Sequence, residues 1–365
     1  MAMNGIKGEK AEHEGLRSAT KIAFFTLGCK VNQFDTEGLI TESREHGYEV
    51  VDFNGPADIY VLNTCTVTKE AERKARQLMR RVKRKYPDAY LVVTGCFAQT
   101  SAEVLTALPE VDLVIGVAGR GRLFQILEEE LPLHSKNQVL PWTKADGFEL
   151  FAPEFSGQTR AFLKIQDGCQ SYCSYCRIPF ARGPVRSLPS AQVLKEIERL
   201  LAFGYKEIVL VGIHLGHYGI DLGTDLASLL EQIEQKWGGA DANWRLRLGS
   251  VDPTDFTPQL MEVVFSSTLL CNHLHIPLQS GSGKVLSLMN RGYTPDDYAG
   301  LASLLRSGRP GLALTTDLMV GFPGETEADF EETLNFLQAV GFSRVHIFPY
   351  SLREGTKAAQ MKGHL

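Results

Sequence analysis

The segment Lys164–Ser187, KIQDGCQSYCSYCRIPFARGPVRS, holds the most informative pattern of the chain. It carries Cys169, Cys173 and Cys176 in the form C-x3-C-x2-C, directly after the apolar run Ala161–Ile165. Three thiolates on one short loop can each hold one iron of a four-iron cluster, which leaves the fourth iron open to a small molecule. Structural zinc takes four ligands, and no fourth Cys or His lies close in the sequence. The pattern therefore favours an iron–sulfur cluster with an open iron.

Strand and helix signals alternate from this loop to the end of the chain. Helical stretches such as Ala191–Phe203 and Glu327–Val340 separate short apolar runs. The six strand candidates are Ala161–Ile165, Glu207–Val211, Trp244–Leu248, His273–Leu278, Leu312–Val320 and Arg344–Tyr350. Strands that alternate with helices form parallel sheets, so six such units predict a partial (β/α)6 barrel of the TIM type over residues 159–365.

The first half of the chain shows the same alternation. Its strand candidates are Lys21–Leu27, Ile59–Leu62, Tyr90–Val93 and Val111–Ile115. Apolar residues at helical spacing predict a helix over Val67–Tyr86. We therefore expect a Rossmann-like parallel α/β domain over residues 21–125. Residues 1–20 are polar and are expected to form a disordered leader, and residues 126–158, which lack clear periodicity, a linker between the domains.

Three further cysteines, Cys29, Cys65 and Cys96, each follow the end of a strand candidate in the first half. Because the carboxyl ends of parallel strands meet at one edge of a sheet, we expect these thiols to lie close together. A single cysteine is more often a small buried apolar side chain. Three at equivalent positions favour a second three-thiolate cluster with an open iron. Cys271 belongs to neither set and is expected to be a buried free thiol.

Composition limits the remaining possibilities. The 365 residues are 44% hydrophobic and 22% charged, and the net charge of −5 gives no global sign of nucleic-acid binding. The sequence holds no run of about 18 apolar residues and no signal-peptide pattern, so we expect a cytoplasmic protein that does not enter a membrane. In that reducing compartment the seven cysteines are not expected to form disulfides. We expect a monomer.

The cysteine loop resembles the signature of the radical S-adenosylmethionine (SAM) superfamily, including the aromatic Tyr175 before its last cysteine. From Lys21 onward the chain resembles the methylthiotransferases, the two-cluster branch of that superfamily. The matching segments are TLGCKVNQ (Thr26–Gln33), NTCTVT (Asn63–Thr68), VVTGCFAQ (Val92–Gln99), the quoted Lys164–Ser187, HIPLQSGS (His275–Ser282), VGFPGET (Val320–Thr326) and FPYSLREGT (Phe348–Thr356).

This resemblance implies an enzyme that uses SAM and two [4Fe-4S] clusters. The SAM-cleaving cluster would be held by Cys169, Cys173 and Cys176, and the auxiliary, sulfur-carrying cluster by Cys29, Cys65 and Cys96. The segments around Cys29 and Lys164–Asp167 are similar to the MtaB-type branch, which methylthiolates C2 of N6-threonylcarbamoyladenosine at position 37 of tRNA. The family also carries a C-terminal RNA-binding domain, called TRAM, which we expect to be absent from this chain.

Several further residues lie where a SAM site is expected, besides Tyr175 of the loop. His275 and Gln279 share the polar face of a strand and are expected at the interior or mouth of the barrel as a wall of the SAM site, in preference to polar residues simply packed there. Four residues follow other strand ends, where turns either shape a cofactor pocket or simply connect a strand to a helix: Gly212, Gly321, Gly324 and Glu325.

A basic stripe is the local candidate for RNA binding. The segment Lys69–Lys85 holds nine basic and two acidic residues, which is either a phosphate-binding face or a solvated helix surface. The candidate RNA contacts within it are Arg73, Lys74, Arg80, Arg81, Lys83 and Arg84. Arg182 and Arg186, after the cysteine loop, either bind the substrate backbone or anchor the loop.

The expected function is methylthiolation of an adenine in the tRNA anticodon loop, supported by an external electron donor of the flavodoxin or ferredoxin type. A single-stranded loop lets the base leave its stack at little cost. Two rivals stay open. One is methylthiolation of another tRNA adenosine or of a ribosomal protein side chain, and the other is a non-catalytic iron–sulfur protein that binds RNA or carries electrons. Electron carriers usually ligate every iron with protein, so two open irons favour an enzyme.

Overall fold

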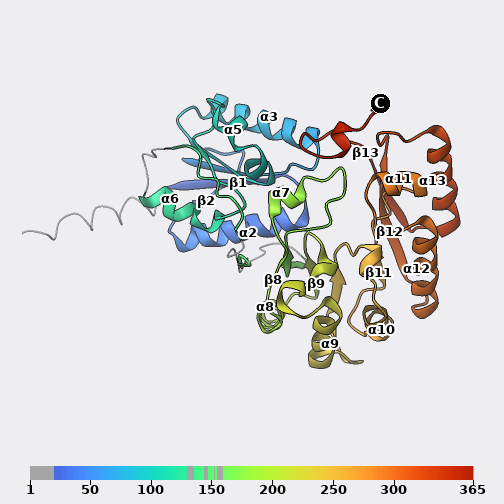
Figure 1. The fold of residues 1–365 in the computed structure, drawn as a ribbon. Helices are drawn as coiled ribbons and strands as arrows, with labels where there is room; N and C mark the ends of the chain where they lie inside the picture. Colours follow the sequence, from blue (N-terminus) through green and yellow to red (C-terminus); the bar gives the residue numbers. More distant parts are fainter. Residues whose placement is uncertain (1–19, 130–134, 144–146, 152, 154–158, 365) are drawn as a thin grey trace, which may run out of the picture. The chain divides into compact units, whose positions relative to one another are not determined.

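The computed structural model describes residues 20–129, 135–143, 147–151, 153 and 159–364. Contacts between Cα atoms divide the chain into two units, residues 1–155 and 156–365 (Figure 1). The expected leader lies outside the described residues apart from Thr20, and the expected linker is described only in part. Within that linker, the amide of Gln138 donates to the carbonyl of Val114 in the first unit. The domain boundaries stay a prediction.

The first unit is built on a five-stranded parallel sheet in the order β2-β1-β3-β4-β5. The strands are β1 (Lys21–Thr26), β2 (Glu49–Val50), β3 (Ile59–Thr64), β4 (Tyr90–Gly95) and β5 (Leu113–Val114). All six residues of β3 are buried, as expected for the central strand of a sheet covered on both faces. The predicted parallel α/β fold of this half is confirmed, and β2 is an additional short strand.

Helices connect these strands. They are α2 (Lys30–Glu45), α3 (Lys69–Lys85), α4 (Cys96–Thr100), α5 (Ala102–Thr106), α6 (Leu123–Glu129) and the 3-10 turn η1 (Arg120–Arg122). The helix expected from Val67 begins two residues later, because the Thr68 hydroxyl accepts the amide of Ala71 and caps the first turn. Val67 is therefore outside the helix and 55% exposed, so the predicted start of the helix is wrong by two residues.

The second unit carries six parallel strands at the positions expected from the sequence. They are β6 (Ala161–Lys164), β9 (Glu207–Val211), β10 (Arg245–Leu248), β11 (His273–His275), β12 (Ala313–Val320) and β13 (Arg344–Pro349). They form two sheets, β10-β9-β6 and β11-β12-β13, and a parallel bridge between Ser250 and His275 links β10 to β11. The chain order of the strands is thus their spatial order, as in a partial (β/α)6 barrel.

The helices of this unit are α7 (Ile178–Arg182), α8 (Ser190–Ala202), α9 (Leu226–Trp237), α10 (Pro258–Ser266), α11 (Gly283–Leu288), α12 (Pro295–Gly308) and α13 (Glu327–Val340), with 3-10 turns η2 (Leu215–His217), η3 (Ile220–Leu222), η4 (Pro253–Asp255) and η5 (Ala358–Gln360). An antiparallel hairpin of β7 (Gln166–Asp167) and β8 (Arg186–Ser187) encloses the cysteine loop and was not predicted. None of the described helices is long and apolar enough to cross a membrane.

Candidate functional site

The cysteine loop of the second unit starts from a glycine that no other residue could replace without strain. Gly168 has φ +77°, and an added Cβ would lie 1.8 Å from the carbonyl oxygen of Pro184. One residue on, the amide of Cys169 donates to the carbonyl of Gly183 (3.1 Å). The β7–β8 hairpin therefore fixes where the loop begins.

Each sulfur atom of the loop accepts a hydrogen bond from a nitrogen donor. The pairs are Ser171 N to Cys169 Sγ (3.5 Å), Arg291 Nη1 to Cys173 Sγ (3.4 Å) and Ile178 N to Cys176 Sγ (3.4 Å). Such donors stabilise thiolates and tune the reduction potential of a cluster that the thiolates hold. The loop thus presents three sulfur atoms that are already provided with hydrogen-bond donors.

The thiols also affect one another's charge. Burial raises the pKa of Cys176 to about 12, and the neighbouring Cys173 and Cys169 thiols add to this by repulsion. Burial also opposes the Cys169 thiolate, but hydrogen bonds from His214 and Ser171 outweigh burial and lower the pKa of Cys169. Because an iron centre binds deprotonated thiols and relieves their mutual repulsion, this arrangement fits a [4Fe-4S] cluster held by three cysteines.

Arg291 is one site residue that sequence reasoning missed. Its guanidinium, 118 residues away from Cys173 in the chain, also pairs with Asp252 and donates to the Tyr293 hydroxyl (3.1 Å). The side chains of Arg291 and Asp252 are both largely buried. A buried cation beside a cluster ligand offsets the negative charge of that ligand. No local pattern marks Arg291, because only the barrel fold brings it to the loop.

His214 is the second missed residue. Its Nε2 lies 2.8 Å from Asp255, and its Nδ1 faces the Ser171 hydroxyl (3.1 Å) and the Cys169 sulfur (3.7 Å). Burial opposes the charged ring, but the hydrogen bonds with Asp255 and Cys169 raise the pKa of His214 to about 10. The signal that could have found it is its position two residues after Gly212, at the carboxyl end of β9.

A cavity of about 310 Å³ opens beside these groups, with Cys173, His214 and Arg291 in its lining. His217 also lines it and stacks on His214 with ring centroids 3.6 Å apart. Together with Asp255 the two histidines could reach one metal ion, since their ligand atoms lie within 4.8 Å of one another. Rings stacked face to face do not aim their nitrogens at a common point, so we favour a small polar ligand in this cavity.

The predicted SAM-site strand residues differ in how they are engaged. Gln279 has φ +70°, unusual for a residue other than glycine, and its buried Oε1 has no hydrogen-bond partner among the described residues. A strained backbone and an orphaned acceptor together are typical of a ligand site. His275, in contrast, reaches Thr315 (2.9 Å) and Asp317 (3.2 Å) through its two ring nitrogens. The structure therefore supports Gln279 more strongly than His275.

The turn after β12 packs against the cysteine loop. Tyr175 meets Phe322 edge to face at 6.3 Å. Gly321 and Gly324 both have positive φ, and Glu325 accepts the amides of Gly321 (2.6 Å) and Phe322 (3.0 Å). Glu325 thus closes its own turn, which is the connecting role left open by the sequence.

The absence of a side chain at Gly212 makes space for the side chain of Gln166. An added Cβ would lie 2.8 Å from Oε1 of Gln166. The same oxygen accepts the amide of His214 (2.8 Å). The glycine therefore allows Gln166 to hold the start of the turn that carries His214.

The three cysteines of the first unit lie at the carboxyl ends of neighbouring strands β1, β3 and β4. Cys29 is the N-cap residue of α2, Cys65 follows β3, and Cys96 begins α4. Gly28, with φ +114°, approaches Cys65 so closely that an added Cβ would lie 3.2 Å from its sulfur. Cys29 is exposed, whereas Cys65 and Cys96 are buried.

A polar network holds this edge of the sheet. The Asn32 side chain donates to the carbonyls of Leu27 (2.8 Å) and Thr64 (3.2 Å), and the Asn63 side chain donates to the Asn32 carbonyl (3.0 Å). The buried Oδ1 of Asn63 has no partner among the described residues. An orphaned buried acceptor on β3, two residues before Cys65, is compatible with a ligand at this edge, and carboxyl strand ends are where ligands of parallel sheets bind.

The basic stripe lies on α3, which buries Ala75, Met79 and Val82 against its own unit. Several of its cations have partners: Arg73 and Lys74 pair with Glu70, Arg80 with Glu110, Arg81 with Asn54 and Lys83 with Asp112. Lys83 is mostly buried in its ion pair, so it is a poor RNA contact, whereas Arg84 is exposed. The stripe is therefore partly neutralised.

Arg182 and Arg186 are buried, which contradicts direct RNA contact by these two side chains. Arg182 pairs with Asp167 (3.0 Å) and is 0% exposed. Arg186 donates to the carbonyls of Arg182 (3.0 Å) and Pro184 (2.9 Å). Both arginines therefore anchor the hairpin that encloses the cysteine loop.

Comparisons with known proteins agree with this arrangement. The radical SAM superfamily matches residues 163–337, and a family described as "Uncharacterized protein family UPF0004" matches residues 21–116. The chain superposes with a TM-score of 0.67 on the radical S-adenosylmethionine methyltransferase TsrM from Kitasatospora setae, at 16% identity over 91% of this chain and 75% of that one. The fold and the cysteine loop define a radical SAM enzyme.

Similar sequences narrow the class. Threonylcarbamoyladenosine tRNA methylthiotransferase MtaB of Bacillus subtilis (strain 168) is 45% identical over 93% of this chain and 76% of its own length. The protein of that name from Aquifex aeolicus (strain VF5) is 41% identical over 94% and 84%. A tRNA-2-methylthio-N(6)-dimethylallyladenosine synthase from Moorella thermoacetica is 36% identical over 93% and 78%. The chain therefore belongs to the radical SAM tRNA methylthiotransferase family, whose cofactors are SAM and [4Fe-4S] clusters.

Proposed function

We propose that this enzyme inserts a methylthio group at C2 of N6-threonylcarbamoyladenosine at position 37 of tRNA. Four relatives at 40–45% identity are named for that nucleoside. The observation that carries the chemistry is the loop of Cys169, Cys173 and Cys176, in which each sulfur has a nitrogen donor and a cavity opens alongside. The cysteines at the sheet edge supply the second cluster site that sulfur insertion needs.

When bound, the clusters and SAM supply a 5′-deoxyadenosyl radical that removes the C2 hydrogen and a methylated sulfur that takes its place. The chain's own residues prepare this chemistry. Arg291 and His214 donate hydrogen bonds to the ligand sulfurs of Cys173 and Cys169. These donors stabilise the negative charge on the two sulfur atoms. Tyr175 closes the loop against an apolar cluster of buried residues and so limits access of water to it.

The buried, unpartnered Oε1 of Gln279 is an acceptor for the amino group of SAM. The carboxylate of SAM would lie at the cavity beside the cysteine loop, whose lining holds His214 and Arg291 together with the Asp252 that pairs with Arg291. These two assignments make the mouth of the barrel the SAM site, in keeping with the carboxyl-end location of active sites in related barrels.

The substrate is a base of the tRNA anticodon loop, which leaves its stack to reach the site. We assign contact with the RNA backbone to exposed cations of α3, Arg84 among them. SAM cleavage also requires an electron, which we assign to a donor of the flavodoxin or ferredoxin type. Substrate and donor of this kind place the reaction in the cytoplasm.

Anaerobic product analysis tests this function. The reconstituted chain, with SAM and dithionite, is given two anticodon stem-loops that carry either threonylcarbamoyladenosine or dimethylallyladenosine at position 37. We expect 5′-deoxyadenosine together with a 2-methylthio nucleoside from the threonylcarbamoyl substrate. Product from the dimethylallyl substrate alone would move the assignment to the other group of relatives, and no 5′-deoxyadenosine from either would refute the enzymatic proposal.

A further inference from the structure

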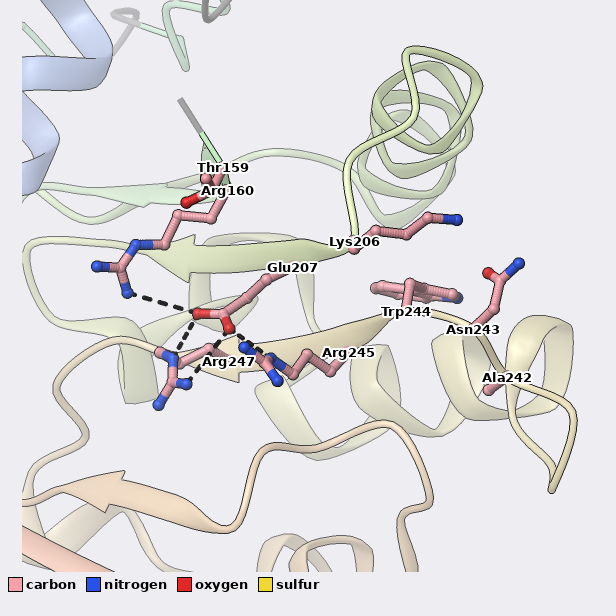
Figure 2. A pocket seen from close by; sticks show the side chains of 9 residues that line it. All are labelled: Thr159, Arg160, Lys206, Glu207, Ala242, Asn243, Trp244, Arg245 and Arg247. Atoms are coloured by element: carbon pink, nitrogen blue, oxygen red, sulfur yellow. Dashed lines mark hydrogen bonds and ion pairs between the residues drawn. The ribbon is translucent and has the colours of Figure 1, made fainter. Parts of the chain in front are cut away.

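A second pocket of the barrel unit lies away from the cysteine loop. Its volume is about 670 Å³, and it is lined by Arg160, Lys206, Glu207, Trp244, Arg245 and Arg247 among others (Figure 2). Glu207 begins β9, Arg245 begins β10, and Arg160 directly precedes β6. The pocket therefore sits at the amino ends of these strands, whereas the cysteine loop follows the carboxyl end of β6.

One carboxylate organises the cations of this pocket. Glu207, 7% exposed, accepts hydrogen bonds from Arg245 Nε (2.5 Å) and Arg247 Nε (2.8 Å), and Arg160 Nη1 lies 3.5 Å from it. Figure 2 shows the three arginines converging on it, Arg160 from the segment before β6 and Arg245 and Arg247 from β10. The hydrogen bond from Arg247 lowers the pKa of Glu207 to about 2, so this carboxylate is ionised at neutral pH.

The charge of this single carboxylate does not balance the positive charge of the pocket. Among its described lining residues, four are cations and Glu207 is the only acid, which leaves three net positive charges. The chain as a whole has a net charge of −5, so the local excess is not a reflection of composition. Like charges held within one pocket repel one another, and a bound anion removes that repulsion.

The geometry of the cations favours phosphate as that anion. Arg245 is 64% exposed and engages Glu207 through Nε, which leaves the terminal nitrogens of its guanidinium for a further acceptor. A guanidinium fork matches two oxygens of a phosphate, and a dianion suits an excess of three charges better than a single carboxylate does.

Two tryptophan side chains adjoin the cations, Trp244 buried at 8% exposure and Trp237 partly exposed. Trp244 lines this pocket and also a neighbouring hollow of about 460 Å³, which shares Lys206 and includes Trp237. Lys236, next to that hollow, lies 4.5 Å from the centre of the Trp237 ring. Cations interleaved with aromatic rings are typical of sites that hold a phosphate together with a base.

We propose that this pocket at the amino ends of β6, β9 and β10 binds a phosphate group of a nucleotide or of an RNA backbone. The two sources share their recognition chemistry and differ in what else is bound. As a site for a free nucleotide it would act on its own. As a site for RNA it would bind a backbone phosphate of the substrate away from the reacting base. Its contribution to the affinity would add to that of the α3 stripe, which is partly neutralised.

The test uses the anaerobically reconstituted full chain and three probes: inorganic phosphate, AMP and an unmodified anticodon stem-loop. The variants Arg245→Gln and Lys206→Gln each remove one exposed cation and keep the Arg247–Glu207 pair, so the fold is expected to persist, as checked by thermal unfolding. Lys195→Gln, on the exposed face of α8, is the control with the same change in charge.

We expect the affinity for at least one probe to fall about fivefold or more in both pocket variants and to stay unchanged in the control. Weaker binding of phosphate and AMP identifies a free-nucleotide site. Weaker binding of the stem-loop alone, with a salt dependence reduced by about one per lost contact, identifies the RNA backbone. The inference is overturned if the wild-type chain binds none of the probes, or if the pocket variants bind all three as the control does. Product formation in the methylthiolation assay is a separate measurement, so failure of either proposal is recognised independently.

Discussion

The two cysteine sites of this enzyme are assembled in opposite ways. Cys169, Cys173 and Cys176 share one loop, while their charged partners His214 and Arg291 arrive from distant parts of the barrel. Cys29, Cys65 and Cys96 come from three strands, while the network that holds them, such as Asn32 with Leu27, is largely built from the same segments. In the first site, local sequence spacing therefore determines the ligands, and the topology of the barrel determines which charged groups surround them. In the second site topology fixes the ligands themselves.

We expect the substitution of Arg291 to have the largest effect, because it changes both the free energy of unfolding and the reduction potential of the loop cluster. Arg291→Ala leaves the buried Asp252 without its cation, so we expect a loss of about 3–5 kcal/mol in the free energy of unfolding. Arg120→Ala in the first unit breaks a buried pair with Asp35 and serves as the matched control. Denaturant unfolding measures both losses. Only Arg291→Ala should also shift the reduction potential of the loop cluster, and an unshifted potential would break the link between Arg291 and Cys173.

The glycines that precede the cysteines give the next largest effect. Gly168→Ala and Gly95→Ala would place a Cβ at 1.8 Å and 2.4 Å from backbone oxygens, at the loop and at the sheet edge respectively. Gly47→Ala is the control, because it also has positive φ but no atom within 4 Å, and should cost about 1–2 kcal/mol. Unfolding experiments should rank the losses Gly168, Gly95, Gly47. Equal losses would mean that the close approaches relax freely.

The thiol reactivity of the folded apoprotein should distinguish the two cysteine sites. The pKa of Cys169 is lowered and that of Cys176 is raised to about 12, so near neutral pH Cys169 is the more ionised and should react faster with iodoacetamide. At the sheet edge, exposure decides instead, and Cys29 should react before Cys65 and Cys96. Peptide mass spectrometry across a pH series follows each site.

The partner of Cys169 provides the control for that experiment. His214→Asn removes the histidine, which together with Ser171 lowers the pKa of Cys169, so the pH at which Cys169 becomes reactive should rise. The order at the sheet edge should not change. If Cys169 keeps its reactivity profile in His214→Asn, the thiol is not controlled by that histidine.

Removing charge from α3 should have the smallest effect. Arg84→Gln, at an exposed position of the helix, should weaken stem-loop binding by about two- to fivefold and reduce the salt dependence by about 0.9. SAM cleavage in the absence of RNA should stay at the wild-type rate, since that reaction belongs to the loop cluster. Lys195→Gln is again the control for charge alone. Unchanged binding by Arg84→Gln would leave α3 a solvated helix surface.

Much of this architecture could be predicted from the sequence because it is encoded locally. The six barrel strands follow from short apolar runs separated by helical periodicity, and α13 has the bounds expected from its pattern. The C-x3-C-x2-C loop is recognisable from spacing alone. The short strands β2, β7 and β8 were missed because two residues carry no periodicity.

The rest depends on contacts between distant segments. Arg291 and His214 reach the loop only through the fold; no local pattern marks Arg291, and only its position after the end of β9 points to His214. Arg182 and Arg186 look like a basic pair after the loop, and only their burial against Asp167 shows that they hold the hairpin. A charge count cannot distinguish a buried arginine from an exposed one.

The division of labour between the two cysteine sites is the central claim, and product analysis of two triple variants tests it most directly. In Cys29/Cys65/Cys96→Ala we expect 5′-deoxyadenosine to form from SAM but no 2-methylthio nucleoside. In Cys169/Cys173/Cys176→Ala we expect neither product. A 2-methylthio nucleoside made by the first variant would contradict the account, because sulfur insertion would then not require the cysteines at the sheet edge.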